Sequence, residues 1–198
     1  MGQLLELVSV DGADAEPIDV VGYSMGARLA LCLAAAHPAR IRRLALIGAT
    51  AGLVSASERA ARVAADEELA DQIERKGIDW FVQHWEAMAL FASQQDLPAP
   101  VRHEVRAGRL AQRPRGLANS LRGFGTGVMP SLWHRLPDLD LPTLAIAGSR
   151  DPEYAALAGQ MAALLPNGAM EVVADVGHAC HLEAPDIVAT LVGEHLRA

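Results

Sequence analysis

Hydrophobic and polar positions follow two different patterns along this chain. Short apolar runs, each followed by a stretch with helical periodicity, lie toward both ends of the chain. In the N-terminal part, residues 18–22 predict a strand buried on both faces, and residues 41–48 predict a second strand. Residues 25–37 between them predict a helix, which Pro38 ends. A strand, a helix and a strand at this spacing indicate a βαβ unit, so we expect a parallel sheet.

The same pattern returns toward the C-terminus. Residues 141–148 and residues 168–174 predict two further strands. Each is followed by a predicted helix, at residues 152–165 and at residues 185–196, and Pro185 lies in the first turn of the second helix. These elements extend the predicted parallel α/β core.

The chain between about Thr50 and Arg135 has a different character. Charged residues are dense there, the periodicity is helical, and no run of residues indicates a strand. We therefore expect an α/β core formed by residues 1–51 and 136–198, interrupted by a helical cap at residues 52–135. Before the first strand, residues 1–10 predict the end of an amphipathic helix.

Composition narrows the class of protein. A chain of 198 residues with 51% hydrophobic residues can bury a sizeable core, and a net charge of −7 argues against a nucleic acid as its partner. No apolar run reaches the roughly 18–20 residues that a membrane span needs, and the N-terminus lacks the basic segment of a signal peptide. The cysteines, Cys32 and Cys180, lack the spacing of metal ligands. We therefore expect a cytoplasmic protein that holds no metal and no cofactor.

The pentapeptide Gly22-Tyr23-Ser24-Met25-Gly26 lies where the first predicted strand gives way to a helix. It matches G-x-S-x-G, in which a sharp strand-to-helix turn presents a serine and glycines keep side chains out of the way. The serine would lie at the N-terminus of the helix, where the Met25 amide and the helix dipole favour developing negative charge. An ordinary strand-to-helix turn would give the same pentapeptide, so the motif needs a base and an acid elsewhere.

Two later loops supply candidates for these groups. Asp151 follows the strand at residues 141–148, and His178 follows the strand at residues 168–174. Carboxyl ends of parallel strands meet at one edge of the sheet, so Ser24, Asp151 and His178 have the order and the positions of a Ser-Asp-His catalytic triad. As alternatives, Asp151 is a good helix N-cap and His178 could be a surface histidine. His181 competes with His178, which we prefer because Gly177 leaves room for its ring; Cys180 is interpreted as a packing residue.

Longer segments carry a resemblance to a known family. "VVGYSMGARLAL", "GSRDPEY" and "VGHACHLEAPDIVATLV" resemble the α/β-hydrolase superfamily. Within it, "FVQHWEAMALFASQ" and "RLAQRPRGLANSLRGFGTGVMPSLW" resemble the 2-succinyl-6-hydroxy-2,4-cyclohexadiene-1-carboxylate (SHCHC) synthases of menaquinone biosynthesis. The resemblance runs from about residue 16 to the C-terminus. It implies an α/β-hydrolase fold with a helical cap.

The activity implied by this resemblance is that of a lyase. The family eliminates pyruvate from 2-succinyl-5-enolpyruvyl-6-hydroxy-3-cyclohexene-1-carboxylate (SEPHCHC), with Ser24 as the base, His178 activating it and Asp151 holding the histidine tautomer. Tyr23 and the Met25 amide would face the developing oxyanion. The alternatives are an esterase or a carbon–carbon-bond hydrolase with Ser24 as the nucleophile, or an inactive homologue.

The substrate of this family is a small polycarboxylate, which guanidinium groups bind well. The resemblance implies that Arg28, one helical turn after Ser24, and Arg62, Trp85 and Arg109 of the cap contact it. As alternatives, the arginines could lie on a solvated helix face and Trp85 in the core. The neighbouring arginines that compete with them for this role are Arg59, Arg102, Arg106, Arg113 and Arg122.

Three departures from the family pattern stand out. The family usually has glycine where Ala27 stands and proline where Ala89 stands, and both changes are small. The family also begins with several strands and an HG-type turn that supplies a second oxyanion amide, and this chain lacks them. We therefore expect an N-terminally truncated core with an exposed apolar sheet edge.

Overall fold

The computed structural model describes residues 16–198, so the helix end predicted at residues 1–10 lies outside the described residues. The chain divides into two compact units. One comprises Met1–Ala51 and Ser131–Ala198 and is termed the α/β unit; the other, Gly52–Pro130, is termed the helical unit.

The α/β unit is built on a four-stranded sheet. Its strands are β1 (Ile18–Tyr23), β2 (Ile41–Ile47), β3 (Thr143–Gly148) and β4 (Gly168–Val173), adjacent in the order β1-β2-β3-β4. All three pairings are parallel, which confirms the sheet predicted from the sequence. Because every strand runs the same way, the loops that follow the four strands gather at one edge of the sheet.

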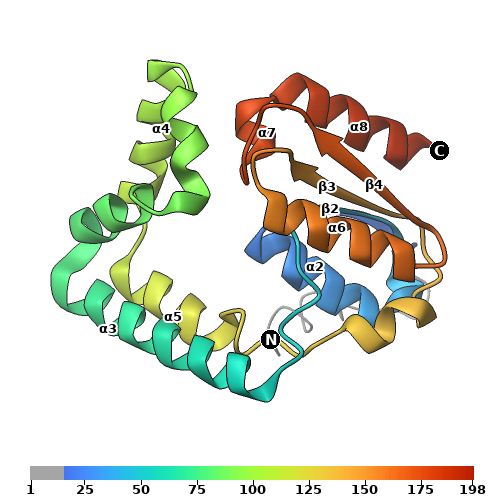
Figure 1. The fold of residues 1–198 in the computed structure, drawn as a ribbon, viewed down its shortest axis with the longest axis horizontal. Helices are drawn as coiled ribbons and strands as arrows, with labels where there is room; N and C mark the ends of the chain where they lie inside the picture. The colour runs from blue at the N-terminus through green and yellow to red at the C-terminus, as the bar shows by residue number, and fades with distance from the viewer. Residues whose placement is uncertain (1–15) are drawn as a thin grey trace. The chain divides into compact units, whose positions relative to one another are not determined.

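Helices cover both faces of this sheet (Figure 1). On one face lie α2 (Met25–Ala36) and α6 (Pro152–Leu164), and on the other lies α8 (Pro185–Arg197). The shorter elements are η1 (Pro38–Arg40), η3 (Trp133–Asp138) and α7 (Cys180–Glu183). Helices and strands therefore occupy the segments that the apolar pattern predicts.

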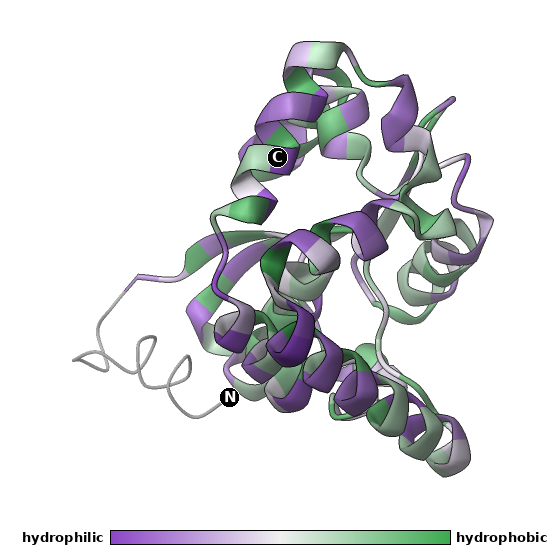
Figure 2. Ribbon diagram, turned by 90° about the vertical axis from the view of Figure 1, so that its left-hand side faces the viewer, coloured by the Kyte–Doolittle hydropathy of each residue, from purple (hydrophilic) through white to green (hydrophobic). Residues whose placement is uncertain are grey.

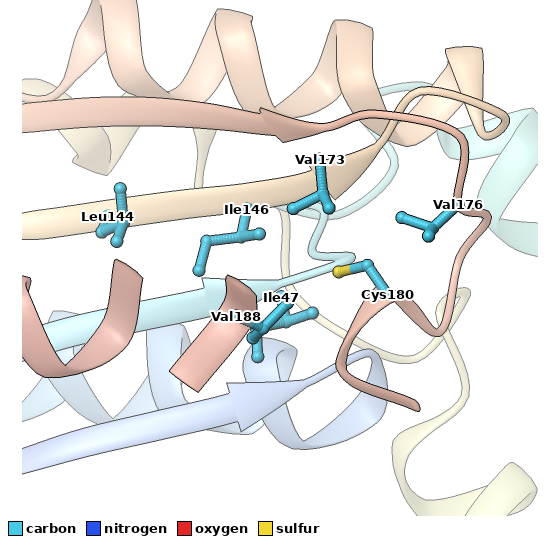
Figure 3. Close-up of a cluster of buried hydrophobic side chains, with 7 residues drawn as sticks. All are labelled: Ile47, Leu144, Ile146, Val173, Val176, Cys180 and Val188. Atoms are coloured by element: carbon cyan, nitrogen blue, oxygen red, sulfur yellow. The ribbon is translucent and has the colours of Figure 1, made fainter. Parts of the chain in front are cut away.

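The alternation of side chains along β3 explains how the two faces are filled. Leu144 and Ile146 point into a buried cluster with Ile47, Val173, Val176, Cys180 and Val188 (Figure 3). The residues between them, Ala145 and Ala147, pack against Ala158 of α6, where small side chains let the helix approach closely. Cys180 is fully buried in the first cluster, and this burial raises the pKa of its thiol to about 11. Its environment agrees with the interpretation of Cys180 as a packing residue.

The prediction that the first strand is buried on both faces is wrong. Ile18 and Val21 of β1 are 50% and 47% exposed. Among residues 16–198, β1 pairs only with β2, so it lies at an edge of the sheet and not between two strands. A β-branched apolar run has the same appearance in both positions, which is why the sequence pattern overestimates the burial.

The helical unit contains α3 (Ala56–Glu86), η2 (Ala89–Asp96), α4 (Ala99–Leu110) and α5 (Pro114–Phe124). The side chain of Ser55 caps α3 by accepting a hydrogen bond from the Glu58 amide at 3.3 Å. Ile73, Phe81 and Val82 form its core, and Figure 2 shows hydrophilic and hydrophobic residues alternating along its helices. Gly77, with φ 82° and ψ −176°, breaks the regular geometry of α3. Over residues 16–198, no helix combines the length and the apolarity that a bilayer crossing requires.

Candidate active site

Ser24 lies on the turn between β1 and α2. Its backbone has φ 48° and ψ −108°, a left-handed conformation that a non-glycine residue adopts only under strain. The Ser24 amide donates a hydrogen bond to the Ile47 carbonyl at the end of β2, at 2.8 Å, and the Ser24 carbonyl accepts from the Arg28 amide at 3.0 Å. These bonds hold the strained turn between the neighbouring strand and the first turn of the helix.

The two glycines of the pentapeptide differ in their surroundings. A Cβ added to Gly22 would lie 2.6 Å from the backbone N and Cα of Ala27, a separation that real Cβ atoms do not show. A Cβ added to Gly26 would have nothing within 4 Å in the part of the chain that the structure describes. The expectation that both glycines make room for the turn therefore applies to Gly22 alone.

We expect Gly22→Ala to lower the free energy of unfolding by about 2–4 kcal/mol, because the clashing atoms are backbone that cannot rotate away. The matched variant Gly26→Ala should leave stability within about 1 kcal/mol of the native chain, with any gain arising from the better helix propensity of alanine in α2. Chemical denaturation of both variants measures the difference. Equal losses in the two variants would contradict this assignment.

The structure brings together the three residues predicted as a triad. The Nε2 atom of His178 lies 3.0 Å from Ser24 Oγ, and Nδ1 lies 2.8 Å from Asp151 Oδ2. His178 is 2% exposed and Asp151 is 7% exposed. A hydroxyl, an imidazole and a carboxylate are thus joined in one line of hydrogen bonds at the carboxyl edge of the sheet. This is the arrangement in which a histidine takes the proton of a serine and a carboxylate steadies the resulting charge.

Asp151 uses its two oxygens for different purposes. Oδ2 lies against His178, while Oδ1 accepts a hydrogen bond from the Tyr154 amide at 3.3 Å and caps α6. The two readings of Asp151 from the sequence, as a helix cap and as the partner of a histidine, therefore describe the same side chain.

The loops that carry Asp151 and His178 are hydrogen bonded to each other. The Arg150 amide donates to the Val176 carbonyl at 2.9 Å, and the Asp175 amide donates to Ser149 Oγ at 2.8 Å. Within the histidine loop, the Gly177 amide donates to Glu183 at 2.7 Å. The carboxylate and the imidazole are thereby fixed in relation to each other.

Aromatic rings enclose the imidazole of His178. The ring of Tyr154 meets it edge-on with a centroid separation of 4.4 Å, and the ring of Tyr23 lies at 5.4 Å. His181, the competing histidine, packs on Tyr23 at 4.2 Å, and its Nδ1 is buried without a hydrogen-bond partner among residues 16–198. Burial, with a smaller contribution from His178, lowers the pKa of His181. The structure thus places His178 against the serine and His181 behind Tyr23.

Gly48, directly after β2, makes room for the same imidazole. Its φ is +58°, and a Cβ added there would lie 2.9 Å from Cε1 of His178. Neither Gly48 nor Tyr154 nor Glu183 stands out in the sequence analysis. The position of Gly48 at the end of a core strand is the one signal that could have indicated it.

We expect Gly48→Ala to reduce the catalytic rate about 10²-fold or more, because the added methyl group displaces the ring of His178 from Ser24. The variant should still fold, since the positive φ adds only about 1 kcal/mol of strain for alanine. Comparison of kcat and of the thermal unfolding midpoint tests this expectation. A variant with native kcat would show that the ring accommodates the methyl group.

The other residues predicted near Ser24 lie around the turn. Met25 is the first residue of α2, where backbone amides have no acceptor within the helix, and 41% of the residue is exposed. Arg28 begins the next helical turn and is half-buried. Tyr23 packs its ring on the two histidines, as described above. Their roles toward a substrate remain predictions.

The structure places Arg62, Trp85 and Arg109 in the helical unit, each with partners there. Arg62 Nε donates to Asp66 at 2.9 Å. Trp85 packs between Phe81 and Phe91, with ring centroids 5.2 and 5.3 Å away, so its contacts are those of a core residue. Arg109 donates to Gln94 at 2.6 Å and to Glu86 at 3.3 Å. Their contact with a substrate also remains a prediction.

No group of three or more His, Cys, Asp or Glu side chains within residues 16–198 is arranged to hold a metal ion. Ser24, His178 and Asp151 form a hydrogen-bonded group in the α/β unit.

Comparison with known proteins places this chain in a family. Residues 2–191 match the alpha/beta hydrolase family. The chain is 42% identical, over 90% of its own length, to a Bacillus subtilis protein provisionally named as a 2-succinyl-6-hydroxy-2,4-cyclohexadiene-1-carboxylate synthase, and it spans 65% of that protein. It is 28% identical to the synthase of that name from Enterobacter sp. (strain 638), again over 90% of this chain, and spans 66% of it.

Comparison with a solved structure supports the same assignment. MenH from S. aureus superposes with a TM-score of 0.89 at 36% identity, over 91% of this chain and 68% of the MenH chain. These findings confirm the fold class and the resemblance inferred from the sequence. The chain belongs to the alpha/beta hydrolase family, and within it the chain is similar to SHCHC synthases.

Proposed function

We propose that this chain carries the catalytic centre of a lyase that eliminates pyruvate from SEPHCHC to give SHCHC in menaquinone biosynthesis. The observation that carries the proposal is the line of hydrogen bonds from Ser24 Oγ through His178 to Asp151, at 3.0 and 2.8 Å. Its support is the similarity to the synthases described above. Since the chain spans about two thirds of their length, the activity of the whole enzyme is part of the proposal.

In the proposed reaction, Ser24 acts as the base. As His178 Nε2 takes the hydroxyl proton, the serine oxygen removes a proton from a ring carbon of the substrate. The electron pair released forms a ring double bond, the carbon–oxygen bond to the enolpyruvyl group breaks, and the departing enolate takes up a proton to become pyruvate. Asp151 stabilises the imidazolium and holds Nδ1 as its protonated nitrogen. The step changes no oxidation state overall.

Negative charge that develops on the substrate would lie near the start of α2. The amide of Met25 and the positive end of the helix dipole stabilise an oxyanion there, and Tyr23 borders the same turn. The carboxylates of the substrate are proposed to bind Arg28, Arg62 and Arg109, with Trp85 as an apolar contact. The proposed partner is thus a small polycarboxylate. A cytoplasmic location, expected from the two unpaired cysteines, belongs to the same proposal.

Incubation of the purified chain with SEPHCHC tests the proposal directly. Release of pyruvate, detected with a coupled lactate dehydrogenase assay, is the expected result. A folded chain that releases none, although a full-length synthase does so under the same conditions, would contradict the lyase activity of this chain.

The same hydrogen bonds would serve a hydrolase in which Ser24 attacks as a nucleophile. That alternative predicts covalent labelling of Ser24 by a fluorophosphonate and turnover of short p-nitrophenyl esters. The lyase needs no acyl-enzyme, so pyruvate release without ester turnover separates the two. If neither activity is seen, the remaining interpretation is an inactive homologue that binds a partner.

A further inference from the structure

The helical unit contains a hollow of its own. It has a volume of about 160 Å³ and lies among the end of α3, η2 and α4. Arg102, Arg106 and Arg109 recur on one face of α4 at spacings of four and three residues, so all three line it. The other lining residues used below are Glu86, Phe91 and Gln94.

Gln94, one of the residues that line this hollow, carries an unsatisfied donor. The residue is 6% exposed, and its Oε1 accepts a hydrogen bond from Arg109 Nη2 at 2.6 Å. A guanidinium only donates, so this bond fixes which end of the amide is the oxygen. The other end, Nε2, is buried and has no hydrogen-bond partner among residues 16–198. A buried amide without an acceptor is unfavourable, and an acceptor that reaches Nε2 from the hollow removes the penalty.

The charges around the hollow also favour an acceptor. Its lining holds three arginines and a single carboxylate, Glu86. That carboxylate is shared, because one oxygen accepts from Arg106 Nη1 and the other from Arg109 Nη1. The Nε and Nη2 atoms of Arg106 have no partner among residues 16–198 and remain available as donors. Positive charge is therefore in excess within a partly enclosed space.

We propose that this hollow is a binding site for a carboxylate, with the Gln94 amide and the Arg106 guanidinium as its donors. Phe91, over which Arg109 lies at 5.8 Å, offers an apolar wall beside them. The volume is below the roughly 300–1,000 Å³ of sites that enclose drug-sized ligands. The hollow therefore takes a short acid or one carboxylate-bearing arm of a larger molecule. Only Arg109 is shared with the substrate contacts proposed above, and the inference does not depend on Ser24 or on the lyase reaction.

The test is titration of the whole chain with succinate at millimolar concentration, followed by calorimetry and by the NMR signals of the glutamine side-chain amides. We expect succinate to bind and to shift the Nε2 protons of Gln94. Gln94→Leu and Arg106→Met should each weaken binding by roughly tenfold or more, because each removes a hydrogen bond to a charged group. Succinamide, which has the same shape without the charges, should bind more weakly than succinate.

Matched variants separate this site from the rest of the chain. Gln72→Leu removes a glutamine of α3 that does not line the hollow, and Ser24→Ala removes the proposed base; neither should change succinate binding. Thermal unfolding shows whether each variant is folded. If Gln94→Leu does not fold, Arg106→Met alone tests whether the hollow binds succinate.

Three results would overturn the proposal. One is absence of succinate binding to the native chain, and another is binding to both Gln94→Leu and Arg106→Met that is as tight as binding to the native chain. The third is binding that is lost in folded Ser24→Ala. Loss of pyruvate release in Ser24→Ala with binding retained would support both proposals separately.

Discussion

Ser24→Ala is expected to lower kcat for pyruvate release by about 10³- to 10⁶-fold. The Ser24 hydroxyl is the atom that lies 3.0 Å from His178 Nε2, and alanine leaves the imidazole with nothing through which to take a proton from the substrate. Substrate binding should change little, since the proposed carboxylate contacts are arginines elsewhere. A coupled assay of pyruvate release over a range of SEPHCHC concentrations measures kcat and KM separately.

The control for this variant is Ser120→Ala. Ser120 lies in α5 of the helical unit, where its hydroxyl bonds to the Gly116 carbonyl at 2.9 Å, and its loss should leave kcat unchanged. If folded Ser24→Ala keeps more than a tenth of the native kcat, another group is the base and the proposed role of Ser24 fails.

Asp151→Asn is expected to reduce kcat by about 10⁴-fold while preserving most of the stability. The asparagine oxygen can still cap α6 by accepting from the Tyr154 amide. The asparagine nitrogen then faces His178 Nδ1 and donates to it, which forces the histidine proton onto Nε2. A protonated Nε2 cannot accept the hydroxyl proton of Ser24. The wrong tautomer would thus inactivate a site whose heavy atoms have barely moved.

Measurement of kcat together with the thermal unfolding midpoint distinguishes this outcome from simple unfolding. Asp138→Asn is the matched control, because the Asp138 side chain is 73% exposed and lies in η3, away from the triad. If Asp151→Asn and Asp138→Asn have similar kcat values, Asp151 does not set the histidine tautomer.

Much of the α/β unit could be predicted because its elements follow from local pattern. Apolar runs identified all four strands, and the helices after them follow the expected segments. Once the strands are parallel, the chain positions of Ser24, Asp151 and His178 are enough to bring their side chains to one edge. That part of the site is a consequence of topology.

Other features depend on contacts that no local pattern contains. Gly48 matters because His178, from a distant part of the chain, occupies the space where its Cβ would be. The exposure of β1 depends on which strands pair, since its β-branched run would also suit a buried strand. The sequence analysis also did not identify the partners of the cap arginines. Arg62 pairs with Asp66, four residues further along the same helix, which is a spacing at which helical side chains commonly pair. Arg109 pairs with Gln94, which lies in a different element, so no local spacing indicates that contact.

The hydrogen bonds between the loops after β3 and β4 have a consequence for motion. Arg150 and Asp175 tie these loops together, whereas Ser24 is held by the turn after β1 and by the end of β2. A fluctuation that opens the site therefore separates the hydroxyl from the imidazole more readily than it separates the imidazole from the carboxylate. The Asp151 carboxylate and the His178 imidazole would then move as a preassembled pair, and reclosure would need only the return of the Ser24 hydroxyl to a histidine already in its working tautomer.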